Sequence, residues 1–129
     1  INNQTQIFFE KDFQNRMNSS IITTGNELSN EQMIEFSKVL NIQELYNYAK
    51  LVKETSEKMI LEISYEETKL KIPEEKKEYL KSLKVVSLNE SSSWLIDYWC
   101  GKNVRGLLQM PFSRHWIMHV EACLKMKNK

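Results

Sequence analysis

Residues that break regular structure are scarce in this chain. It has three glycines and two prolines among 129 residues, so few turns are marked by the residues that usually form them. Such a sequence favours long helices over many short strands, and we expect an all-α fold. The length suits a single domain over residues 1–129 with a hydrophobic core. A composition of 41% hydrophobic and 27% charged residues is typical of a globular protein.

Charge and cysteine content argue against several classes of protein. The formal net charge is +1, which provides no basic field for nucleic acid. No apolar run approaches the roughly 20 residues of a membrane span, and the sequence shows no signal peptide. Cys100 and Cys123 are the two cysteines, too few for a disulfide framework. We therefore expect two free thiols of low reactivity in a cytoplasmic protein without nucleic-acid or membrane partners.

Helical periodicity is clear in the first half of the chain. Residues 4–17 carry aromatic and apolar side chains at helical spacing, which predicts one helix. Ser29 followed by Gln32 is the capping-box pattern that begins a further helix. Asn41 precedes the longest helical pattern, residues 42–63, which has one apolar face.

Two shorter helices are predicted in the second half. Pro73 suits the first position of a helix over residues 73–83, because proline fixes the backbone angle that a helix start needs. Residues 91–93 are serines that can cap a helix over residues 94–100, and Gly101 can end it. The aromatic side chains gathered in this helix predict a core position, with a ligand pocket as the alternative.

The last stretch, residues 111–129, carries the strongest candidates for chemistry. His115 and His119 are the two histidines of the chain and are four residues apart, so they lie one above the other on one helix face. Two imidazoles held in this way can bind one metal ion. The alternative is a pair of core histidines that form hydrogen bonds with their neighbours. The helical stripe to which they belong contains Phe112, His115, Trp116, His119, Val120, Cys123 and Met126.

The two longest apolar stripes suggest how the core is built. They belong to residues 42–63 and residues 111–126, and we expect these helices to pack against each other. Leu45 and Trp116 should then both be buried.

The order of elements resembles that of the DinB/YfiT-like family, the four-helix bundles described as metalloenzymes. Both have a helix end, a loop, a long amphipathic helix, an irregular segment and a last helix that bears HxxxH. Two metal-binding histidines of the family lie on that last helix, and His115 and His119 in RHWIMH match them. The family's third histidine, on its second helix, has no match here, because its position would fall near or before Ile1. The resemblance implies an antiparallel four-helix bundle, either complete or without its first helix.

The resemblance also implies a function. It predicts a divalent metal, namely nickel, zinc, iron or manganese, and a small-molecule substrate that undergoes hydrolysis or thiol-dependent transfer. A homodimer is compatible with such a protein. The competing hypothesis is a metal-free helical protein with an interaction or structural role, in which the histidines belong to the core.

A catalytic metal needs about three protein ligands, so a third is sought beyond His115 and His119. Asp97 is the first candidate, because an acid among aromatic residues needs a partner; the alternative is that it faces water. Cys123 could share an ion with His119 but not with His115, from which it is about 12 Å along the helix axis. Glu10 and Asp12 are further options, and Glu121 is interpreted as a surface charge.

Overall fold

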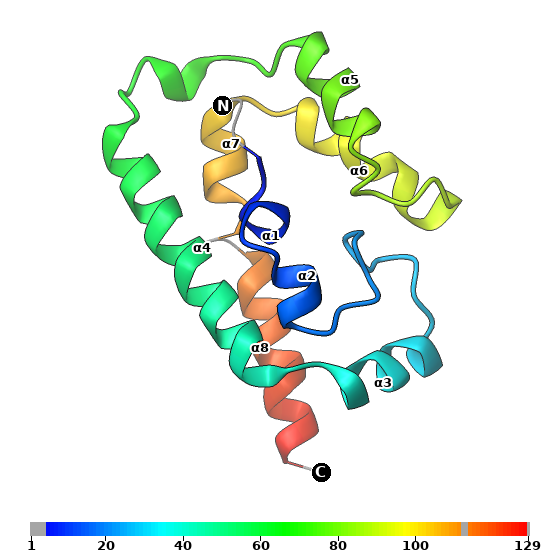
Figure 1. Ribbon diagram of the computed structural model, residues 1–129. Helices are drawn as coiled ribbons and strands as arrows, with labels where there is room; N and C mark the ends of the chain where they lie inside the picture. The colour runs from blue at the N-terminus through cyan, green and yellow to red at the C-terminus, as the bar shows by residue number, and fades with distance from the viewer. Residues whose placement is uncertain (1–4, 112–113, 129) are drawn as a thin grey trace.

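The computed structural model describes residues 5–111 and 114–128, and in these ranges the chain forms helices without strands. The all-α prediction is therefore confirmed. Figure 1 shows the helices arranged around the short N-terminal ones, with α4 along one side and α5 and α6 as a hairpin at the upper right. The helices are α1 (Ile7–Glu10), α2 (Phe13–Arg16), α3 (Asn30–Val39), α4 (Ile42–Glu62), the 3-10 turn η1 (Glu67–Lys69), α5 (Glu74–Ser82), α6 (Glu90–Cys100), α7 (Val104–Gln109) and α8 (Arg114–Lys127).

The start signals of α3 and α4 work as the sequence predicts. The Ser29 side chain accepts a hydrogen bond from the backbone N–H of Gln32, and the Gln32 side chain accepts one from the backbone N–H of Ser29. Asn41 caps α4 by accepting from the backbone N–H of Glu44 at 3.2 Å. These bonds satisfy donors that a helix start leaves without partners.

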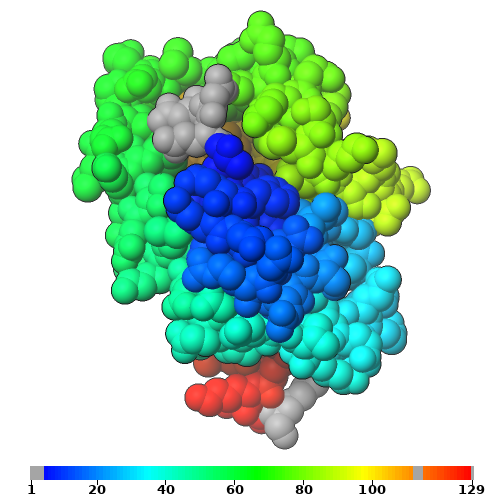
Figure 2. Space-filling view, in the orientation of Figure 1, coloured from blue at the N-terminus to red at the C-terminus, as the bar shows by residue number. Residues whose placement is uncertain are grey.

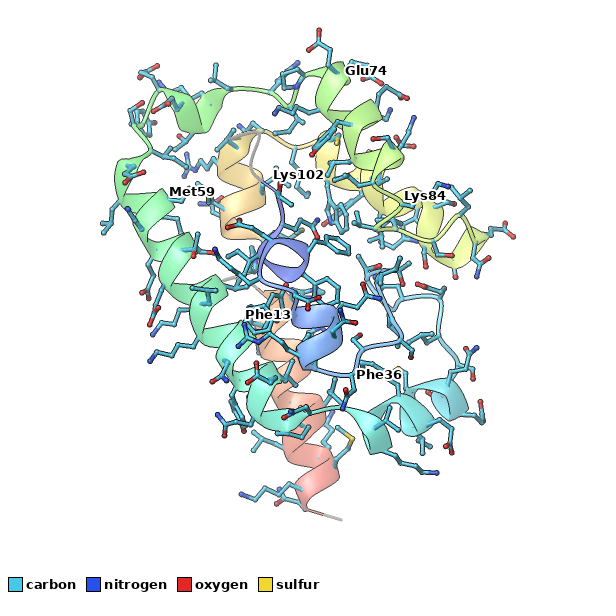
Figure 3. All side chains as sticks on the ribbon, viewed as in Figure 1. Phe13, Phe36, Met59, Glu74, Lys84 and Lys102 are labelled. Carbon is cyan, nitrogen blue, oxygen red and sulfur yellow. The ribbon has the colours of Figure 1, made fainter. Side chains whose placement is uncertain are left out.

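The N-terminal helices pack on α4 through aromatic side chains. Phe13 is 1% exposed, and its ring lies 5.1 Å from that of Tyr48, while Phe8 meets the same tyrosine edge-on at 5.9 Å. Figure 3 labels Phe13 where α2 faces α4. An ion pair between Arg16 and Glu44, with nitrogen and oxygen 2.6 Å apart, joins the same two helices. This contact buries the Phe13 side chain between α2 and α4.

The second core lies between α5 and α6. Its buried members are Val85, Val86, Leu95 and Ile96, against which Leu80, Trp99 and Cys100 pack. The loop that contains Val85 also reaches the N-terminal half of the chain, because the backbone carbonyl of Val85 accepts a hydrogen bond from Thr24 at 2.9 Å. This bond connects the α5–α6 core to the loop that follows α2.

Two predicted helices have different bounds in the structure. The helix expected over residues 4–17 is broken between α1 and α2, where Asp12 adopts a left-handed conformation with φ of 54°. A non-glycine residue in this conformation interrupts a right-handed helix. The helix expected from residue 94 starts at Glu90 after Asn89, so the three serines lie inside α6 and do not cap it.

The predicted burial of the last helix is wrong. Trp116 is 59% exposed, Leu45 is 38% exposed, and every residue from His115 to Asn128 is classed as exposed. Figure 2 shows the lower end of α8 projecting from the molecule beside α3 and α4. Helical periodicity predicts that a helix has an apolar face, but it does not say which element covers that face. Within the described residues, no element covers α8.

Candidate metal centre

The two histidines of α8 face each other across one helical turn. Their Nε2 atoms are 3.0 Å apart, and their ring centroids are 4.6 Å apart with the planes at 72°. Both residues are exposed, so they are not the core histidines of the competing hypothesis. In the hydrogen bond between them, one Nε2–H donates and the other Nε2 accepts through its lone pair.

This arrangement is close to what one metal ion requires. Zinc binds imidazole nitrogen at about 2.0–2.1 Å, so two nitrogens in a tetrahedral site are about 3.3 Å apart. The observed 3.0 Å differs from this value by a few tenths of an ångström, a change that small side-chain rotations can provide. The pair therefore fits as two ligands of a single divalent ion.

A third ligand is not found among the residues that the structure describes. No group of three or more His, Cys, Asp and Glu side chains in those ranges could hold a metal ion. Cys123 and Glu121 share α8 with the histidines and are exposed. The described part of the chain thus offers two ligands, which is fewer than a catalytic zinc site uses.

Asp97, the third ligand expected from the sequence, lies in an ion pair. Its Oδ1 is 2.8 Å from Nζ of Lys77 on α5, and 67% of its side-chain surface is exposed. The hydrogen bond from Lys77 and the charge of that lysine lower the pKa of Asp97, and the same contact raises the pKa of Lys77. The aspartate on α6 thus has its partner in a neighbouring helix and water around it. It is not brought into a group with the histidine pair.

The two acidic residues of the N-terminal segment, Glu10 and Asp12, pair with side chains close to them in the sequence. The Glu10 carboxylate lies 2.8 Å from Nζ of Lys11, and Asp12 accepts a hydrogen bond from Nδ2 of Asn15 at 2.7 Å. Both acids are exposed, and the structure brings neither into a metal-binding group.

The aromatic helix divides between surface and core. Trp94 and Tyr98 are exposed and meet edge-on at 5.6 Å, whereas Leu95 and Ile96 are buried. Trp99 and Cys100 line a cleft. The sequence leaves a ligand pocket as the alternative to a core position. Of Trp94, Tyr98 and Trp99, it is Trp99 that lies at such a cleft.

The prediction of free cysteines is confirmed for both residues. Cys100 and Cys123 are unbridged, with Cys100 partly buried and Cys123 exposed. Burial is the main reason that the pKa of the Cys100 thiol is raised, which leaves less thiolate at neutral pH.

No family model, curated protein or solved structure matches the chain. Of the helices described, none is both long enough and apolar enough to cross a membrane.

Proposed function

We propose that this chain is a metal-binding helical protein of the DinB-like type, in which His115 and His119 supply two ligands to one divalent ion. The observation that carries the proposal is the 3.0 Å separation of their Nε2 atoms. An i, i+4 pair on a regular helix holds this spacing without distortion of the backbone. Zinc, nickel, iron and manganese are all candidates for the ion.

The proposal extends to an enzyme acting on a small molecule by hydrolysis or thiol-dependent transfer. A bound divalent ion would supply a Lewis acid and would lower the pKa of a coordinated water. In this proposal the role of the chain is to hold the ion through the imidazoles of His115 and His119, which are exposed on α8. Because the described residues provide two ligands, the other positions must be filled by water or by groups outside the described residues.

We also propose a DinB-like four-helix bundle as the setting of α8. On a helical wheel of about 100° per residue, Arg114, Glu121 and Lys125 share a sector of roughly 40°. Apart from Lys127 near the end of the helix, the rest of the circumference carries apolar residues and the two histidines. A helix that is apolar over most of its circumference is typical of a buried position among several neighbours. Because the described elements leave α8 exposed, the neighbours in this setting would have to come from outside them.

The test of metal binding is calorimetric titration with zinc and with nickel. Wild type, His119→Ala and Lys125→Ala are compared, the last as a control on the same helix with both histidines kept. We expect heat from wild type and Lys125→Ala, and a large loss of affinity in His119→Ala. Equal heats from all three proteins, or no heat from any, would remove the metal proposal.

A second function, association through α8, is favoured by a separate observation. The exposed apolar residues of this helix are Trp116, Ile117, Met118, Val120, Leu124 and Met126. Contiguous exposed apolar surface of this kind marks protein interaction sites. We infer a second copy of the chain as the partner, since a net charge of +1 opposes self-association little.

Sedimentation equilibrium over a range of protein concentrations tests this second function. A dimer that dissociates in Trp116→Lys but not in Trp94→Lys, an exposed tryptophan on α6, would support it. A monomer at all concentrations would contradict it. Because the titration varies His119 and the sedimentation experiment varies Trp116, each function is tested by its own substitution.

A further inference from the structure

A cleft of about 410 Å³ lies between the segment of residues 63–73, α5, the end of α6 and α7. Its walls are mainly apolar and include Ile72, Leu80, Trp99 and Leu107. A volume of this size is within the range of roughly 300–1,000 Å³ found for small-molecule sites. The cleft is separate from the histidine pair, because neither histidine and no other described side chain of α8 lines it.

Backbone hydrogen bonds fix the wall that comes from the irregular segment. The N–H of Val104 donates to the carbonyl of Leu70 at 3.0 Å, and an isolated bridge pairs Lys71 with Asn103. Asn103 also caps α7 by accepting from the N–H of Gly106 at 2.9 Å. The opposite wall belongs to the α5–α6 core, on which Leu80, Trp99 and Cys100 pack. The cleft is therefore bounded by ordered structure on both sides.

Among the described residues that line the cleft, basic side chains outnumber acidic ones. Lys71 and Lys76 line it, together with one acid, Glu67. The Glu67 carboxylate accepts from Oγ and from the backbone N–H of Ser64 at 2.6 and 2.8 Å, and these bonds lower its pKa. These bonds favour the ionised carboxylate, so the described lining carries two lysines against one negative charge.

Lys76 differs from the other lysines of α5. Lys77 pairs with Asp97 and Glu74, and Lys81 pairs with Glu78. Lys76 is half-buried and makes no ion pair with any residue in the described ranges. The half-buried Lys76 side chain lines an apolar cleft without a counter-charge from the described residues, and an anionic ligand can provide one.

We propose that this cleft binds an amphipathic carboxylate of medium chain length, such as a saturated fatty acid. The hydrocarbon tail packs against Ile72, Leu80, Trp99 and Leu107, and the carboxylate lies at Lys76 with Lys71 at the rim. The apolar walls account for the tail, and the net positive charge of the lining accounts for the acid.

The experiment is calorimetric titration with decanoate and, as a neutral probe of the same length, decanol. Wild type is compared with Lys76→Gln and with Lys58→Gln, an exposed lysine of α4 that does not line the cleft. We expect Lys76→Gln to weaken decanoate binding about tenfold, the effect of losing a charge-assisted hydrogen bond, with little change for decanol. Lys58→Gln should bind both probes as wild type does.

A second variant locates the binding site. Leu107→Trp fills the cleft and should weaken both probes, whereas Ile117→Gln on the exposed face of α8 should weaken neither. Circular dichroism checks that each variant is folded. Three results would each overturn the proposal: no heat with wild type, equal loss of decanoate binding in the two lysine variants, or full binding by a folded Leu107→Trp.

Discussion

Nε2 of His119 lies 3.0 Å from Nε2 of His115 across one turn of α8, and both imidazoles are exposed. The separation depends on the spacing of four residues, which places both side chains on one face of the helix. Metal affinity from this pair should therefore depend on the position of each histidine and not on their number alone.

The first prediction tests this dependence on position. The double variant His119→Ala with Ile117→His keeps two histidines but separates them by two residues, or about 200° around the helix. We expect zinc affinity to fall to that of His119→Ala alone, because the two rings can no longer reach one ion. Calorimetry with zinc measures this. Retention of wild-type affinity would mean that the histidines do not act as a chelating pair.

The second prediction concerns the contact of α2 with α4. Phe13→Ala should lower the free energy of unfolding by about 3–5 kcal/mol, the usual cost of truncating a buried aromatic residue. Phe9→Ala is the matched control, since Phe9 is among the exposed large side chains, and its cost should be much smaller. Urea unfolding measures both. Similar losses in the two variants would contradict the assignment of Phe13 to the core.

The helices of this protein could be predicted from the sequence more closely than their packing. Ser29 and Asn41 mark the starts of α3 and α4 because capping is a local interaction between a side chain and the next turn. The break at Asp12 could not be predicted, because a left-handed residue there depends on how α1 and α2 meet α4. The sequence predicts a buried Trp116, whereas the residue is exposed. Periodicity shows that a helix has an apolar side, but it does not show which element packs against that side.

The same limit applies to the candidate sites. The approach of His115 to His119 follows from helix geometry, so the sequence was sufficient. The ion pair between Asp97 and Lys77 joins two helices and depends on how α5 lies against α6. The cleft is harder to predict from the sequence than either of these contacts. Its wall depends on the backbone hydrogen bond between Val104 and Leu70, which belong to separate segments.

The third prediction is a pH dependence that involves Asp97 and Lys77. The pKa of Asp97 is lowered from its ordinary value of 3.8, so its contribution to stability is present above that value and is lost as pH falls through the folded-state pKa. The pKa of Lys77 is raised from 10.5, so its contribution is present below that value and is lost as pH rises through the folded-state pKa. The pair should therefore stabilise the fold between these two limits.

Thermal unfolding of Asp97→Asn against wild type measures this contribution. The difference in melting temperature should be small at neutral pH, because the pair is exposed and screened by solvent, and it should disappear well below pH 3.8. Glu90→Gln is the control, an exposed acid on the same helix. A difference that grows as the solution is acidified would contradict the direction of the pKa shift.

The fourth prediction follows from the exposure of α8. In dilute solution Trp116→Ala should change the free energy of unfolding by less than about 1 kcal/mol, as expected of an exposed side chain away from the core. If a second copy covers α8, the same substitution should destabilise the protein increasingly as its concentration rises. Unfolding measured at two protein concentrations separates these outcomes. A large loss at low concentration would show that α8 is covered within a single chain.

The last prediction compares the two thiols. Cys123 is exposed, whereas Cys100 is partly buried and its pKa is raised, mainly by that burial. Alkylation requires thiolate and access, so native protein treated with iodoacetamide at neutral pH should be modified first at Cys123. Peptide mass spectrometry over time measures the two rates, and unfolding in urea should bring them close together. Faster modification of Cys100 in the native protein would mean that the α5–α6 core opens more readily than its burial indicates.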